Sequence, residues 1–233
     1  MARRRFFVDC IDGDRATLEG QDAHHLARVL RAEPGQRYEI TDGTALCLAE
    51  VETVTPRAVA FRIVEALDPG PPLPPIILIV SLFKFDRFEW MIEKVTELGV
   101  KAILPVESTR TDEGLFKAAA KRVERWRKIA RESSQQSRRV RVPDIYEAVR
   151  LAKAPRFPTT IRLDENQQGP PLATLLQDWN RTDDLALAIG PEGGWTEHDR
   201  ALLDCPAAGL GPTILRAETA AIATAVLATT MSW

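Results

Sequence analysis

Five prolines stand within the seven residues Pro69–Pro75 and divide the chain into two parts of different pattern. Proline lacks a backbone N–H and fixes φ, so this segment cannot lie inside a helix or a central strand. It is typical of a stiff linker, although a proline-rich surface loop inside one domain would have the same composition. Because the pattern changes across it, we predict two domains, residues 1–70 and 76–233, joined by a linker at 71–75.

The part before the linker consists mainly of short alternating or β-branched apolar runs, which predict strands. An Asp-Gly pair at 42–43 stands between the first two runs and is a hairpin signal. One helix is predicted over Asp22–Arg31, with Leu26, Val29 and Leu30 on one face. A small β-barrel is the natural architecture at this size. The predicted strands are Arg37–Thr41, Ala45–Thr53 and Ala58–Val64.

The part after the linker alternates strands with helices, which predicts a parallel sheet with helices on both faces. Ile76–Leu82 is a nearly continuous apolar run, as expected of a strand buried on both faces. Asp86 is predicted to cap the helix that follows, and Gly99 to end it. A long basic helix is predicted over Glu113–Ser133. Further strands are predicted at Ala102–Val106, Thr160–Leu163 and Leu185–Ile189, and further helices from Thr196 and from Glu218 to Thr230.

Two segments repeat a plan of strand, glycine-containing turn and helix. The first, Leu185–Thr196, contains a Gly-Pro-Glu-Gly-Gly turn at 190–194, and the second is Gly209–Ala220. Parallel α/β sheets bind ligands at the carboxyl ends of strands, and glycine lets the backbone approach a ligand closely. Neither segment is a Walker loop or a G-x-G-x-x-G motif. From local physics alone, the first segment is as well explained by a tight structural turn as by a ligand site. Glu218 is as well explained by its favourable interaction with the helix dipole as by a functional role.

The formal net charge of −2 conceals an uneven distribution. Between Lys117 and Arg141, ten basic residues stand against two acidic ones, whereas residues 164–204 hold nine acidic residues and two basic ones. A basic run is usually a solvated helix face, but this one continues into Gln135–Arg139, whose side chains suit phosphate and ribose contacts. The local field of the run, not the total charge, therefore favours contact with RNA.

Several classes of protein are excluded by what the sequence lacks. The longest apolar run, near Ile76–Phe83, is far shorter than the roughly 18 residues of a membrane span, and the basic N-terminus lacks the apolar core of a secretion signal. Three widely spaced cysteines indicate a reducing compartment and not a disulfide framework. Adjacent His24 and His25, with only His198 besides, argue against a metal site. We therefore predict a cytoplasmic protein that binds neither membrane nor metal.

Nine short motifs follow one another along nearly the whole chain. They are Arg5–Val8, His24–Arg31, Asp42-Gly43, Lys84–Arg87, Glu93–Val100, Arg125–Ala130, Gln136-Ser137, Gly190–Gly194 and Leu215–Ala220. Each is weak alone, but their joint order and spacing resemble the bacterial RsmE-type methyltransferases. That family methylates N3 of a single uridine in 16S ribosomal RNA and belongs to the SPOUT superfamily.

The resemblance implies an α/β fold, with an N-terminal PUA-like β-barrel and a C-terminal SPOUT-type parallel α/β domain that contains a trefoil knot. It also implies S-adenosylmethionine as cofactor, bound in the knot loops, and 16S ribosomal RNA or the small ribosomal subunit as partner. The resemblance further implies a homodimer with the site near its interface. The cofactor-binding positions that it implies are Ile189, Gly190, Pro191, Glu192, Gly193, Gly194, Leu210, Gly211, Leu215, Arg216, Glu218, Thr219 and Ala220.

Such a reaction sets three tasks, because uridine N3 carries a proton and lies on the pairing edge of the base. The enzyme must expose that edge, remove the proton and align N3 with the methyl group. We predict that Arg216 stabilises anionic charge on the uracil oxygens, and that Glu218 orients Arg216 or accepts the proton. The residues predicted to bind RNA are Arg3, Arg4, Arg5, Arg28, Arg31, Lys84, Arg87, Arg110, Arg138 and Arg139.

Two alternative functions stay open at this point. The chain could be a SPOUT enzyme that methylates another RNA position, such as a ribose 2′-hydroxyl, or a non-catalytic RNA-binding factor in ribosome assembly. The two intact turns argue against the second alternative. The chain also departs from the family pattern at Ser133–Gln136, where Ala-Ala-Glu-Gln is commoner. Thr109 and Asp199 stand where Glu is common, and Trp195 where Phe is usual.

Overall fold

The computed structural model describes residues 5–164, 166 and 169–231. The chain forms two compact units. The first contains the chain up to Pro72 together with Ser134–Val142, and the second contains Leu73–Ser133 and the chain from Pro143 onward. Each unit has its own sheet and its own hydrophobic core, so the two are described separately.

The first unit is built on one six-stranded sheet, and its order is β1-β4-β5-β6-β3-β2. Its strands are β1 Arg5–Phe7, β2 Ile11–Asp12, β3 Arg15–Glu19, β4 Arg37–Thr41, β5 Leu46–Val54 and β6 Ala58–Ala66. β1 pairs with β4 in parallel, and the other pairs are antiparallel. Buried Phe6, Leu18, Ile40 and Phe61 form its core. All three predicted strands are present, with the predicted turn at 42–43 between β4 and β5.

The predicted helix of this unit differs from expectation. It consists of α1 (Gly20–His24) followed by a π-helical turn, η1 (His25–Val29). Leu26 is buried, but Val29 and Leu30 are 62% and 39% exposed, so the three do not share a buried face. A π turn hydrogen-bonds to the fifth residue back, as Leu30 N does to His25 O, and so changes the phase of the side chains that follow.

Ser134–Val142 belongs to the first unit although it lies in the middle of the later sequence, where we expected one continuous domain. A buried carboxylate on β4 explains this placement. Glu39 accepts hydrogen bonds from Arg5 Nη2 at 3.0 Å and from Arg138. In addition, Thr41 Oγ1 donates to Val140 O at 3.1 Å. Part of the basic run is therefore fixed against the first sheet.

The second unit has one sheet in which every pair is parallel, as predicted. Its order is β10-β8-β7-β12-β11-β13, and β9 also pairs with β8. The strands are β7 Ile76–Ser81, β8 Ala102–Glu107, β9 Asp144–Ile145, β10 Val149–Arg150, β11 Thr159–Leu163, β12 Leu185–Ile189 and β13 Ala207–Ala208. β7 and β12 lie in the centre and are buried throughout, which explains their continuous apolar sequence.

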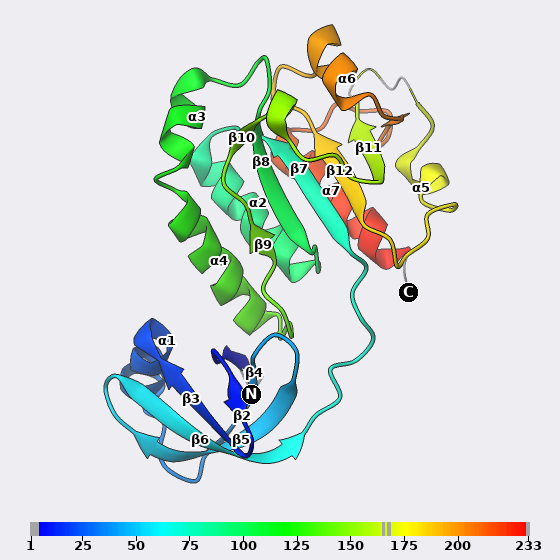
Figure 1. Ribbon diagram of the computed structural model, residues 1–233. Helices are drawn as coiled ribbons and strands as arrows, with labels where there is room; N and C mark the ends of the chain where they lie inside the picture. The colour runs from blue at the N-terminus through cyan, green and yellow to red at the C-terminus, as the bar shows by residue number, and fades with distance from the viewer. Residues whose placement is uncertain (1–4, 165, 167–168, 232–233) are drawn as a thin grey trace. The chain divides into compact units, whose positions relative to one another are not determined.

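Helices cover both faces of this sheet (Figure 1). They are α2 Phe85–Glu97, α3 Glu113–Ala119, α4 Val123–Gln136, η2 Leu151–Lys153, α5 Leu172–Leu175, α6 Glu197–Leu203 and α7 Ala217–Thr230. On one face α7 packs against α2, β7 and β12. On the other face Ile77 and Ile79 of β7 form a core with residues of η2 and α6. After every strand of this sheet except β9, which is followed by β10, the next element along the chain is a helix.

Two predicted helix features are wrong in detail. The basic segment is not one helix over Glu113–Ser133, because Arg122 N bonds to Ala119 O in a tight turn before α4 starts at Val123. Within α4, Trp126 is fully buried. The cap of α2 is Lys84, and Asp86 lies in its first turn, where a negative charge still favours the helix dipole. Gly99 follows the helix with φ +96°, as predicted.

Candidate active site

A cavity of about 430 Å³ lies at the carboxyl ends of three neighbouring strands. The last residues of β11, β12 and β13, Leu163, Ile189 and Ala208, all line it. Both predicted strand-to-helix turns also contribute to its walls. The size falls within the roughly 300–1,000 Å³ of small-molecule sites, and the position is where parallel sheets bind ligands.

The first turn, at 190–194, is held by the tryptophan that follows it. A Cβ on Gly190 would lie only 3.1 Å from the Trp195 ring, so glycine allows this close approach without displacing the ring. The ring is buried, and its Nε1 donates to Leu163 O at 2.9 Å. Trp195 therefore joins the end of β11 to the turn after β12.

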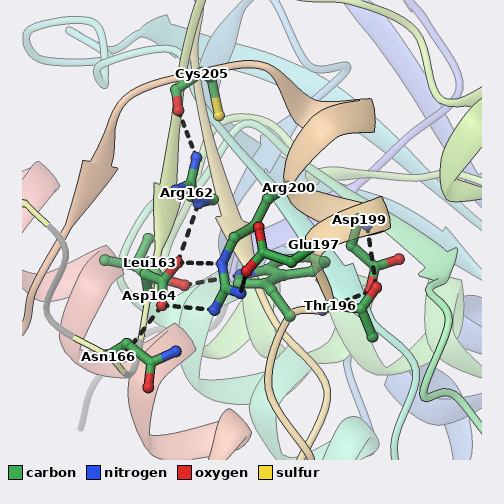
Figure 2. Close-up of polar contacts among 10 residues, drawn as sticks. Arg162, Leu163, Asp164, Asn166, Thr196, Glu197, Asp199, Arg200 and Cys205 are labelled. Carbon is green, nitrogen blue, oxygen red and sulfur yellow. Dashed lines mark hydrogen bonds and ion pairs between the residues drawn. The ribbon is translucent and has the colours of Figure 1, made fainter.

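Thr196 starts α6 with a reciprocal cap. Its Oγ1 donates to Asp199 Oδ2 at 2.7 Å, and Asp199 N donates back to Oγ1 (Figure 2). The other oxygen, Asp199 Oδ1, accepts from Thr109 N at 3.0 Å and Thr109 Oγ1 at 2.8 Å. Burial raises the pKa of the Asp199 carboxyl, but these hydrogen bonds outweigh it and hold the pKa below its usual value.

Asp164 follows β11 and lines the cavity, yet its side chain is fully buried in an ionic network (Figure 2). Arg200 Nε lies 2.9 Å from one oxygen, and Arg200 Nη2 lies 3.2 Å from the other. Arg162 Nε adds a contact at 3.2 Å, and Asn166 N a fourth at 3.1 Å. Burial raises the Asp164 pKa, but the bonds from Arg200, Asn166 and Arg162 bring it below its usual range. The Arg200 pKa is raised by the same pair.

The second turn leads into α7 and brings two charged side chains to the cavity region. Arg216 is the N-cap residue of α7 and lines the cavity. Its guanidinium is exposed and has no hydrogen bond or ion pair with any residue that the structure describes. Glu218 has a side chain only 9% exposed. Its Oε1 lies 3.8 Å from Arg87 Nε, whereas Oε2 has no partner within the described part of the chain.

Most of the predicted cofactor-binding residues are brought together by the fold. Those that line the cavity are Ile189, Gly190, Pro191, Glu192, Gly194, Leu210, Gly211, Leu215, Arg216 and Ala220. Gly193, Glu218 and Thr219 are not among its lining residues, and Gly193 instead accepts a hydrogen bond from Arg110. The lining residues that we did not predict as cofactor-binding are Arg87, Leu163, Asp164, Ala208, Thr213, Ile214 and Ala217.

The residues predicted to bind RNA are divided between the two units. Arg3 and Arg4 lie outside the described residues. In the first unit, Arg28 and Arg31 are exposed. Arg5 is buried against Glu39, which also pairs with Arg138, and burial lowers the pKa of Arg139 to about 10. In the second unit, Lys84 and Arg110 are exposed and Arg87 faces the cavity.

Family comparison defines the class of protein that this fold and cavity represent. Residues 71–229 match the RNA methyltransferase domain family, and residues 18–64 match the RNA methyltransferase PUA domain family. The chain is thus an RNA methyltransferase with an N-terminal PUA-like domain. The trefoil knot stays a prediction.

Relatives narrow the class. The chain is 33% identical to ribosomal RNA small subunit methyltransferase E of Bacillus subtilis over 93% of this chain and 92% of that protein. The Mycobacterium tuberculosis protein of that name is 30% identical over 95% of this chain and 89% of its own length. The chain belongs to the ribosomal RNA small subunit methyltransferase E family.

Solved structures agree with this assignment. The Neisseria gonorrhoeae member bound to S-adenosyl methionine superposes with a TM-score of 0.85, at 29% identity over 98% of both chains. A putative methyltransferase from Legionella pneumophila, in complex with the same cofactor, gives 0.84 at 26% identity over 99% of this chain and 98% of that one.

Two further findings concern membrane-spanning helices and metal sites. No helix in the described ranges is long and apolar enough to cross a membrane. Within those same ranges, no group of three or more His, Cys, Asp or Glu side chains is arranged to hold a metal ion.

Proposed function

We propose that this protein transfers the methyl group of S-adenosylmethionine to N3 of one uridine in 16S ribosomal RNA. The observation that carries the proposal is the cavity at the carboxyl ends of β11, β12 and β13, walled by both predicted turns. Family membership and the S-adenosyl methionine bound to the Neisseria gonorrhoeae relative support it.

The residues around the cavity suit this cofactor. Leu163, Ile189, Leu210 and Leu215 give it apolar walls, while the Gly190 turn lets backbone groups approach a ligand. The exposed Arg216 guanidinium offers a charge-assisted contact to a carboxylate or to a uracil oxygen. When bound, S-adenosylmethionine supplies a methyl group on a sulfonium, and the electron pair of the broken S–C bond stays on sulfur.

We assign the proton to Glu218 and the developing charge to Arg216. Glu218 does not itself line the cavity, but it contacts the lining residue Arg87. Its buried Oε2 has no partner in the described chain, so we assign the N3 proton to that oxygen. The electron pair left on N3 then forms the new N–CH₃ bond. Arg216 compensates negative charge on the uracil oxygens, because its guanidinium is not engaged by another described side chain. The base must be unpaired or flipped to reach the site.

Reverse transcription across 16S RNA tests the reaction, after incubation with enzyme and cofactor. N3 methylation blocks pairing, so we expect the polymerase to stop at one uridine, and only when cofactor is present. Methylation of a ribose 2′-hydroxyl would leave pairing intact and would favour the alternative RNA target. If cofactor neither stabilises the protein in a thermal shift nor produces a stop, the chain is a non-catalytic RNA-binding factor and the proposal fails.

For RNA docking we propose two groups of cations. Arg28 and Arg31 are exposed on the first unit, and Lys84 and Arg110 on the second. Each phosphate contact should add roughly 0.7–0.9 to the slope of log affinity against log salt. A double variant, Arg28→Gln with Arg31→Gln, should lower that slope and weaken binding. An unchanged slope would remove this pair from the docking surface.

We also propose a homodimer and a cytoplasmic location, where ribosomal RNA is available as substrate. Helices α2 and α7 pack on one another, and each exposes a large apolar side chain, Trp90 at 49% and Val226 at 37%. Apolar and aromatic side chains of this kind are enriched at protein interfaces. Analytical ultracentrifugation of the wild type and of Trp90→Glu tests the dimer. A monomeric wild type at micromolar concentration would contradict it.

A further inference from the structure

Arg87 lies in the first turn of α2, directly after the central strand β7. Arg87 lines the cavity, and its side chain is 33% exposed. Nη1 lies 2.8 Å from Glu192 Oε1, and Nε lies 3.8 Å from Glu218 Oε1. The two carboxylates come from different elements, the turn after β12 and the start of α7. One cation therefore connects both turns that form the cavity.

Helix stability does not explain this arginine. A positive charge at a helix N-terminus opposes the helix dipole, by roughly 0.3–1 kcal/mol at an exposed site. From the sequence we predicted that Arg87 binds RNA, but in the structure its Nη1 donates to Glu192 instead. The position of Arg87 fits a role inside the cavity better than a role on an RNA-binding surface.

Glu218 supplies the reason for a cation at this point. A buried carboxylate that lacks hydrogen bonds is costly, and a nearby positive charge offsets that cost. Arg87 faces Oε1 only, so Oε2 is left without a described partner. Apart from Arg87 and its partner Glu192, the charged residues that line the cavity are Asp164 and Arg216, and neither has an ion pair with Glu218 in the described chain. Asp164 is paired with arginines, and Arg216 has no ion pair within the described chain.

We propose that Arg87 is a positioning residue for methyl transfer, and that it does not bind an RNA phosphate. It holds Glu218 by one oxygen, so that the other oxygen is presented as proton acceptor, and it fixes the Glu192 turn in the same contact. This inference rests on the proposed role of Glu218 as the proton acceptor.

The test compares Arg87→Gln and Arg87→Lys with Arg150→Gln. Arg150 pairs with Glu107 at 3.2 Å on the same sheet but does not line the cavity, so it is a matched control. For Arg87→Gln we expect the single-turnover rate at saturating cofactor and RNA to fall roughly thirtyfold, less than the roughly 100-fold or more for losing a general base. Cofactor affinity by calorimetry, and RNA affinity with its salt slope, should change less than about threefold.

The lysine variant guards against a folding defect. Lysine keeps the charge and the buried stem but not the two-pronged guanidinium, so we expect it to fold and to recover part of the rate. If Arg87→Gln keeps its rate but loses RNA affinity and roughly 0.7–0.9 of salt slope, Arg87 is a phosphate contact and the proposal is wrong. Equal rate losses in Arg87→Gln and Arg150→Gln would also overturn it.

A double-mutant cycle with Glu218→Gln separates this inference from the proposed function. If Arg87 acts through Glu218, adding Arg87→Gln to Glu218→Gln should lower the rate less than about threefold further. If the two losses multiply, Arg87 acts independently, and the positioning role fails while the role of Glu218 stands. If Glu218→Gln alone keeps full turnover, the proposed role of Glu218 fails, and the positioning role fails with it.

Discussion

Two buried carboxylates, Asp164 in the cavity wall and Glu218 beside the lining residue Arg87, are in opposite states. Asp164 is fully buried and accepts from Arg162, Arg200 and the Asn166 backbone, so both oxygens are engaged. Glu218 is almost as buried, yet it has one long ionic contact and one oxygen without a partner in the described chain. Burial alone therefore does not distinguish the two carboxylates; the number of hydrogen-bond donors around each of them does.

This difference has a physical basis. A carboxylate that already accepts four hydrogen bonds would have to lose some of them to take a proton, so it is a poor acceptor but a strong connection between segments. Asp164 connects the end of β11 to α6 through Arg200. A buried carboxylate with an oxygen that lacks a hydrogen-bond partner lowers the stability of the fold, and such unfavourable groups are typical of functional sites.

The largest effect is expected from Asp164→Asn. The change leaves Arg162 and Arg200 without their shared negative charge, and breaking a buried pair costs about 3–5 kcal/mol of unfolding free energy. Urea unfolding measures this. Glu107→Gln is the control, because it breaks an Arg150 pair in which Arg150 is 68% exposed, and should cost about 1 kcal/mol or less. Similar losses in both variants would show that Asp164 is not the stronger connection.

Glu218→Gln should have the opposite effect to Asp164→Asn: a large loss of turnover and little loss of stability. We expect the single-turnover rate to fall at least roughly 100-fold, about 2.7 kcal/mol in activation free energy. The unfolding midpoint should stay the same or rise, because a neutral amide is less costly to bury. Cofactor affinity measured by calorimetry provides the control. A large fall in stability with normal turnover would place Glu218 in the structural class with Asp164.

The sequence predicted the elements around the cavity better than the contacts within it. The strand before the turn at 190–194 was recognised because a central parallel strand is continuously apolar, and Thr196 because capping chemistry is local. The strand ending at Leu163 was predicted too, but its place next to β12 was not, since strand order depends on pairing between distant segments. Asp164 was therefore missed as a lining residue.

Long-range polar pairs were equally hidden. Thr109 and Asp199 both depart from the family pattern, and the structure shows that they bond to each other across 90 positions of sequence. Glu39 pairs with Arg138 across 99 positions of sequence. Arg138, which we predicted to bind RNA, therefore belongs to the first unit. No spacing rule finds such pairs, because they depend on the completed fold. The π turn at η1 was missed for a local reason, since one extra residue per turn leaves no distinct composition.

A smaller effect tests how the end of β11 is held to the turn after β12. Trp195→Phe keeps an aromatic ring but removes the Nε1 bond to Leu163 O, leaving that buried carbonyl without this donor. We expect a loss of about 1 kcal/mol in urea unfolding. Cofactor affinity should change little if Asp164 alone keeps β11 in place, and should fall if Trp195 shares that task. If neither stability nor cofactor affinity falls, the hydrogen bond from the Trp195 indole is dispensable.

The smallest effect is the pH dependence of the stability that the Asp199 charge contributes. Hydrogen bonds hold the pKa values of Asp199 and Asp164 below normal, so the native state binds fewer protons than the unfolded state near pH 4. Their stabilisation is complete above the unfolded value of about 3.9 and is lost as pH falls through the native pKa values. We therefore expect the urea concentration at the unfolding midpoint, measured from pH 7 to pH 3, to decrease once the pH is below about 4. The difference in urea midpoint between wild type and Asp199→Asn should become smaller as the pH falls. A constant difference would show that the Asp199 charge does not contribute to stability.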